Sequence, residues 1–110
     1  MRKRLYALLG IILFTVAIQT TMSVQAAEPL VVVEPGHGGD NLGTDYLPIP
    51  EKDYDFIVAM YMKAYLEQYQ DVKVYLTRTG DVAMSHKERA QFAKSVNADF
   101  LFSLHFNAFI

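Results

Sequence analysis

Two histidines and one glutamate, His37, His105 and Glu51, are the residues of this sequence best suited to chemistry. Each histidine follows a run of apolar residues that predicts a β-strand, at 30–34 for His37 and at 100–104 for His105. The chain contains no cysteine, so a metal site would have to use imidazole and carboxylate ligands. Two imidazoles and one carboxylate, with a fourth position kept for water, are the ligands of many catalytic zinc sites.

The elements that must position these residues alternate between strands and helices. Helices are predicted by polar and apolar spacing and by acidic or capping residues at their starts. We expect strands at 30–34, 72–77 and 100–104, a first helix from Glu51 or Asp53 to Gln70, and a second from Ser85 to Val96. The order β-α-β-α-β predicts an α/β fold, a three-layer domain with a mainly parallel sheet, because helical crossovers join parallel strands.

The carboxyl ends of parallel strands lie at one rim of a sheet, where ligands of open α/β sheets bind. If strand 30–34 lies between the other two, His37 and His105 follow neighbouring strands about 4.8 Å apart and can share one ion. Glu51 begins a helix that starts at the same rim. Simpler interpretations stay open: Glu51 as an acidic residue at a helix N-terminus, and His105 as a hydrogen-bonded histidine.

The segment between the first strand and the first helix is rich in glycine and proline. Pro35 is expected to end the strand because it has no N–H to donate. Gly36, Gly38 and Gly39 allow a tight turn that would hold His37 at its tip.

The second helix carries clear start and stop signals. Ser85 and Glu88 form a capping box, and Asn97 suits a left-handed residue just after the helix. His86 lies in the first turn, where we expect it to be solvated. Small side chains on one face would let this helix lie close to the sheet: Ala90, Ala93 and Val96.

The composition indicates a globular protein, and the first residues of the chain indicate export. Of its 110 residues 52% are hydrophobic and 20% charged, and the net charge of −2 gives no reason to expect nucleic acid as a partner. Residues 1–26 have the layout of a cleaved signal peptide, with a basic start and an apolar run that is short for a membrane-spanning helix, and an uncleaved N-terminal anchor is the alternative. We therefore expect export to the periplasm or the cell exterior, with membrane contact only through that peptide.

Five segments follow one another in a recognisable order: VVVEPGHGGD at 31–40, EKD at 51–53, LTRTGD at 76–81, RA at 89–90 and ADFLFSLHFNA at 98–108. Together they resemble the zinc-dependent N-acetylmuramoyl-L-alanine amidases of the amidase-3 type, which are bacterial cell-wall hydrolases. The resemblance implies a mixed α/β domain that cleaves the amide between N-acetylmuramic acid and L-alanine in peptidoglycan, with Zn²⁺ held by His37, Glu51 and His105.

The same resemblance implies a glutamate general base near the end of the domain. No residue here matches it, so we expect the base beyond residue 110, with 27–110 forming the N-terminal portion of a catalytic domain and the C-terminal part missing. Glu34 is a candidate partner for the ring of His37. Three further residues match family positions, with capping or charge roles as alternatives to substrate contact: Arg78, Arg89 and Asn107.

A second hypothesis is a truncated, catalytically inactive zinc-binding or cell-wall-associated module. A glycosidase is disfavoured, because it would need two carboxylates facing each other across a sugar and would leave the histidine pair without a role.

Overall fold

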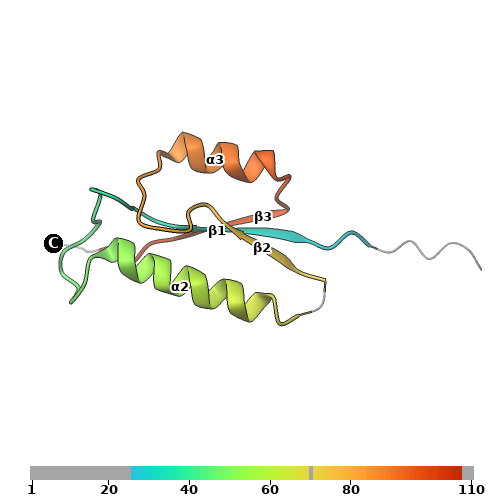
Figure 1. Cartoon of the computed structure of the whole chain (residues 1–110), viewed down its shortest axis with the longest axis horizontal. Helices are drawn as coiled ribbons and strands as arrows, with labels where there is room; N and C mark the ends of the chain where they lie inside the picture. The colour runs from blue at the N-terminus through green and yellow to red at the C-terminus, as the bar shows by residue number, and fades with distance from the viewer. Residues whose placement is uncertain (1–25, 70, 108–110) are drawn as a thin grey trace, which may run out of the picture.

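The computed structural model describes residues 26–69 and 71–107 and contains three strands and two helices (Figure 1). Residues 1–25 lie outside the described residues, and with them nearly all of the expected signal peptide. The elements are β1 (Leu30–Pro35), α2 (Glu51–Leu66), β2 (Lys73–Leu76), α3 (His86–Ser95) and β3 (Phe100–Leu104).

The sheet has the strand order β2-β1-β3, and both pairings are parallel. Val31 lies opposite Val74 on one side and Phe100 on the other, so β1 is the central strand. Its Val32 and Val33 are fully buried, as expected for a strand covered on both faces. The predicted α/β class, parallel pairing and strand order are confirmed.

Strand β1 continues one residue further than predicted. Pro35 pairs with Leu104 as the last residue of the strand, although it has no N–H for the ladder. Its carbonyl oxygen accepts hydrogen bonds from two arginine side chains instead, which compensates for the weakened strand end. Pro35 therefore ends the strand as expected, but as its last residue, so the predicted range 30–34 was one residue too short.

The helices cover opposite faces of the sheet, so the domain has three layers (Figure 1). The hydrophobic core lies between α2 and the sheet, because α2 presents an apolar stripe to the side chains on that face. Its buried members are Val31, Val33, Ala59, Val74 and Leu76.

Helix α2 ends at Leu66, four residues before the predicted end. The residues that follow tighten into turns, with Gln68 N–H donating to Tyr65 O and Tyr69 N–H donating to Leu66 O. Such bonds to the third residue back commonly close a helix, and no glycine or proline marks this end in the sequence.

Helix α3 starts and stops as predicted but turns a different residue inward. Ser85 Oγ accepts from Glu88 N–H and the Glu88 carboxylate accepts from Ser85 N–H, so the capping box is confirmed. Asn97 is left-handed, with φ 53°. Ala90 is exposed, however, and the buried residue of this helix is Arg89. Ala93 and Val96 are partly buried, so the expectation that small residues face inward holds for two of the three, and Arg89 reaches from the helix to the turn after β1.

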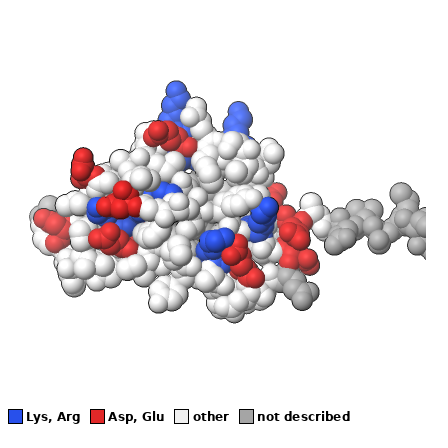
Figure 2. All heavy atoms as spheres, in the orientation of Figure 1, with Lys and Arg blue, Asp and Glu red and all other residues white. Residues whose placement is uncertain are grey.

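The outer strand β3 leaves apolar side chains exposed. Phe100, Leu101 and Phe102 are each about half exposed, as expected for a strand at the edge of a parallel sheet with nothing described beyond it. Neither described helix is long and apolar enough to cross a membrane. On the face seen in Figure 2, basic side chains lie beside acidic ones and form no continuous basic surface among the described residues.

Candidate metal centre

The turn after β1 holds His37 in a fixed orientation. His37 has a left-handed backbone, with φ 54°, and the two glycines that follow it also have positive φ. Its Nδ1 lies 2.9 Å from Asn41 Oδ1, which also accepts a hydrogen bond from Gly43 N–H. Because that oxygen can only accept, Nδ1 carries the proton and Nε2 is left with a free lone pair. Asn41 thus sets the tautomer that a metal ligand needs.

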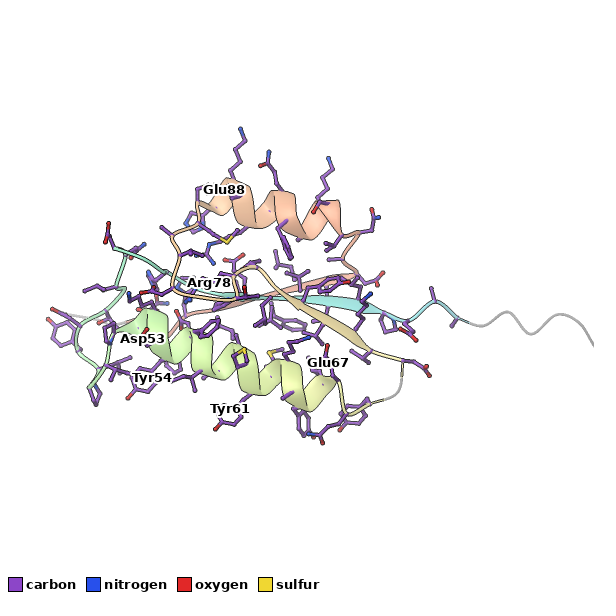
Figure 3. All side chains as sticks on the ribbon, viewed as in Figure 1. Asp53, Tyr54, Tyr61, Glu67, Arg78 and Glu88 are labelled. Carbon is purple, nitrogen blue, oxygen red and sulfur yellow. The ribbon has the colours of Figure 1, made fainter. Side chains whose placement is uncertain are left out.

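The buried side chain of Arg78 also holds this turn in place. Its guanidinium donates to the carbonyl oxygens of Gly36 at 2.9 Å, Lys52 at 2.7 Å, Pro35 and Gly80 (Figure 3). Burial, the main cause, and the nearby Arg89 lower the pKa of Arg78. With these N–H groups used on main-chain oxygens, Arg78 positions the turn.

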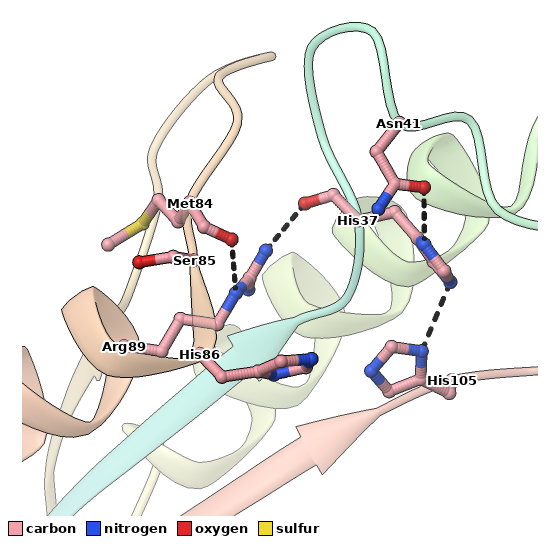
Figure 4. Close-up of a pocket in the computed structure, with 7 residues that line it drawn as sticks. All are labelled: His37, Asn41, Met84, Ser85, His86, Arg89 and His105. Carbon is pink, nitrogen blue, oxygen red and sulfur yellow. Dashed lines mark hydrogen bonds between the residues drawn. The ribbon is translucent and has the colours of Figure 1, made fainter.

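Arg89 makes a second set of bonds to the turn. It donates to Pro35 O at 2.7 Å and to His37 O at 2.6 Å, and it also bonds Met84 O at the start of α3 (Figure 4). The arginine therefore ties α3 to the residue that carries the imidazole. A five-donor guanidinium is well suited to this, because it can satisfy several carbonyl oxygens at once.

Glu51, the first residue of α2, is 1% exposed and fully hydrogen-bonded. Its Oε2 accepts from Thr44 N–H at 2.8 Å, and its Oε1 accepts from the backbone N–H groups of Phe106 at 2.8 Å and Asn107 at 3.2 Å. Burial alone would raise the pKa of Glu51, but these three amides and His37 lower it to about 2. Glu51 is thus held ionised at neutral pH.

The predicted ligands His37, Glu51 and His105 meet at one point of the rim. His37 Nε2 lies 3.1 Å from His105 Nδ1 and 3.2 Å from Glu51 Oε1, and the third side of this triangle is 3.5 Å. Zinc bonds of about 2.05 Å in a tetrahedron would separate neighbouring donors by about 3.3 Å. The three donor atoms therefore fit a zinc ion without rearrangement.

Asp55, which the sequence analysis did not single out, joins this group. One donor atom from each of His37, Glu51, Asp55 and His105 lies within 4.8 Å of the others. Asp55 is fully buried, and burial together with the charge of Glu51 raises its pKa to about 6. The available signal was its spacing, four residues after Glu51 on the same helix face.

Glu34 does not hold the ring of His37. It is buried and accepts a hydrogen bond from the Ser103 hydroxyl at 2.8 Å, while Asn41 provides the partner of His37 Nδ1. Asn107 contributes through its backbone N–H to Glu51, and its own backbone is left-handed with φ 52°.

A cavity of about 280 Å³ opens beside the donor atoms of the two rim histidines (Figure 4). His86 is exposed, as expected, but it also lines this cavity, which the capping box gave no reason to predict. The other residues that line it are His37, Asn41, Met84, Ser85, Arg89 and His105. The donor triangle is therefore accessible to a small polar group from one side.

A family model described as N-acetylmuramoyl-L-alanine amidase matches residues 31–110. The chain is 35% identical over 79 residues to the N-acetylmuramoyl-L-alanine amidase CwlM of Bacillus licheniformis, covering 71% of this chain and 31% of that protein. It is 32% identical over 79 residues to the sporulation-specific N-acetylmuramoyl-L-alanine amidase of Bacillus subtilis, again covering 71% and 31%. The chain thus spans about a third of the length of these relatives.

Solved structures give the same result for the fold. An N-acetylmuramoyl-L-alanine amidase from Clostridium difficile 630 superposes with a TM-score of 0.72 at 35% identity, covering 76% of this chain and 46% of that one. The catalytic domain of CwlV from Paenibacillus polymyxa superposes with a TM-score of 0.69 at 28% identity, covering 72% and 45%.

Proposed function

The chain belongs to the N-acetylmuramoyl-L-alanine amidase family, and from that premise we propose that it forms part of a zinc-dependent enzyme acting on bacterial peptidoglycan. The reaction is hydrolysis of the amide between N-acetylmuramic acid and L-alanine. The observation that carries the proposal is the triangle of donor atoms, whose sides of 3.1, 3.2 and 3.5 Å match tetrahedral zinc.

His37, Glu51 and His105 would hold the ion. The hydrogen bonds that backbone N–H groups donate to the Glu51 carboxylate keep it ionised. Asn41 keeps Nε2 of His37 free to bind a metal. When bound, zinc supplies Lewis acidity, which polarises a carbonyl oxygen and lowers the pKa of water. The charge, tautomer and spacing of these residues therefore suit amide hydrolysis.

The remaining rim residues would orient the site. Arg78 and Arg89 fix the carbonyl oxygens of the turn, so that His37 keeps its position when a substrate enters the adjoining cavity. The family resemblance also implies a glutamate as proton acceptor, and none of the described residues is assigned that role.

Export follows from the substrate. Peptidoglycan lies outside the cytoplasm, and we propose that residues 1–26 direct the chain to the periplasm or cell wall as a cleaved signal peptide.

The test uses the whole natural protein with purified peptidoglycan and mass analysis of the products. We expect separation of glycan strands from stem peptides, loss of that activity in chelator, and recovery with Zn²⁺. Cleavage within the glycan, or indifference to chelator, would overturn the amidase assignment. Bound zinc without any cleavage would support the inactive wall-binding alternative.

The ligand set has its own test, His105→Ala. Removing one of three ligands should abolish stoichiometric zinc binding, as measured by metal analysis after dialysis. His86→Ala is the matched control, because this exposed histidine lies outside the donor triangle and its removal should leave zinc content unchanged. Unchanged zinc in His105→Ala would show that the ligand set is wrong.

A further inference from the structure

The unexplained group in this molecule is the carboxylate of Asp55. It lies on α2 one helical turn after Glu51 and is fully buried. Within the described residues neither of its oxygens has a hydrogen-bond partner. A buried carboxylate without a donor is costly, and a second carboxylate one turn away increases that cost.

The other buried carboxylates of the domain are satisfied. Glu34 accepts from the Ser103 hydroxyl, and Glu51 accepts from three backbone amides. Asp55 is the exception among the described buried acids, so its environment calls for a positive partner.

The nearby arginines do not provide that partner. Arg78 donates to four carbonyl oxygens, and Arg89 donates to three. Neither makes a hydrogen bond to Asp55.

Gly36 shows where Asp55 is directed. A Cβ atom at this position would lie 2.7 Å from Asp55 Oδ2 and 2.5 Å from the His105 ring. The missing side chain therefore leaves the carboxylate and a metal-binding imidazole facing the same small space. Asp55 also belongs to the donor group by distance, because one ligand atom from each of His37, Glu51, Asp55 and His105 lies within 4.8 Å of the others.

We propose that Asp55 is a fourth protein ligand of the zinc ion, binding through a carboxylate oxygen beside His37, Glu51 and His105. The proposal rests on the metal centre of the proposed function. Two carboxylates would balance the two positive charges of the ion, which explains why both are buried on one helix face. Zinc accepts four or five ligands, so Asp55 would be able to bind the ion together with the other three side chains.

The test is Asp55→Asn in the whole natural protein, with Asp53→Asn as the matched control. Asparagine keeps the shape of the side chain but loses the charge, and Asp53 lies on the same helix turn outside the donor group. Zinc affinity is measured by competition with a chelating dye. Folding is checked by thermal unfolding in chelator.

We expect Asp55→Asn to weaken zinc binding by about 100-fold or more, and Asp53→Asn to leave it unchanged. Stability in chelator should stay the same or rise, because a buried anion is removed. The visible spectrum of the Co²⁺-substituted protein should also change, since it responds to the number and kind of ligands.

A loss of less than about 100-fold, which an outer partner of a ligand would also cause, or an unchanged cobalt spectrum would overturn the fourth ligand. This failure is distinguishable from failure of the metal centre itself, because His105→Ala would still abolish zinc binding in the first case and would not in the second.

Discussion

At the amino-terminal end of α2 charged side chains are buried, whereas at its carboxyl-terminal end charged and aromatic side chains face solvent. Glu51 and Asp55 are 1% and 0% exposed. Tyr61 is 74% exposed and projects away from the sheet (Figure 3), and the ion pair of Lys63 with Glu67 lies at the surface. The amino-terminal end of the helix therefore reverses the usual preference for exposing charges, whereas the charges of its carboxyl-terminal end follow it.

The difference shows what determines burial in this helix. At the start of α2 nearly every buried charge has specific partners, such as Lys52, which donates to Gly39 O at 2.9 Å and to Asp81 at 2.6 Å. These bonds hold the turn that carries His37. At the carboxyl-terminal end of α2 the helix positions no candidate site residue, and its charged side chains lie at the surface, where water and salt screen their interactions. The burial of charges at the amino-terminal end of α2 is explained by the candidate site, and their exposure at the carboxyl-terminal end by ordinary packing.

The largest expected difference between substitutions at the two ends of α2 is in their effect on zinc affinity. Glu51→Gln removes the charged ligand, so we expect affinity to fall by more than about 100-fold, beyond the loss caused by removing an outer partner of a ligand. Glu67→Gln makes the same chemical change at the far end and should leave affinity unaltered. Dye competition measures both. A Glu51→Gln protein within tenfold of the unaltered protein would contradict the comparison.

The next effect is the pH dependence of the metal-free protein. The pKa of Asp55, raised from 3.8 to about 6, means that its ionised form destabilises the fold. This penalty is present above pH 6 and disappears as the pH falls towards 3.8. Glu51 acts oppositely, because its pKa is lowered from 4.5 to about 2 and its stabilisation is lost only below pH 4.5.

Thermal unfolding in chelator should therefore show stability rising from pH 7 to about pH 4.5, on the order of 2 kcal/mol from Asp55. The Asp55→Asn protein should lack this rise. An equal rise in the variant would assign the pH dependence to other groups.

A smaller contrast is expected between two lysines of α2. Lys52 and Lys63 each donate to one carbonyl oxygen and one carboxylate, but the Lys52 side chain is 11% exposed and that of Lys63 is 34% exposed. We expect Lys52→Met to lower the free energy of unfolding by about 1–3 kcal/mol, and Lys63→Met by about 0.5 kcal/mol. Denaturant unfolding of the two variants measures the difference. Equal losses would show that burial at the rim adds nothing.

The parts of the fold that sequence could predict are those set by local patterns. The three β-branched residues of β1, the capping box at Ser85 and the left-handed Asn97 act over a few neighbouring positions, and the structure has all of them. The parallel rim then brought His37 and His105 together by topology alone.

The remaining features depend on contacts that sequence spacing does not reveal. Arg89 donates to Pro35 O and His37 O from 54 and 52 positions away, so its burial has no local signature. Asn41 acts from a loop, where no periodicity applies. Asp55 was not singled out from the sequence, because its burial is decided by the strands packed against α2.

The order of the strands also governs when the site can form. His37 and His105 are 68 positions apart, and their rings meet only when β3 pairs directly with β1. Closing so long a loop is entropically costly and slow, and two helices and β2 lie within it. A chain still being synthesised, or still crossing a membrane, would therefore lack the complete donor set. We expect metal uptake to be a late event in folding, so the time course of zinc binding would report the completion of the sheet.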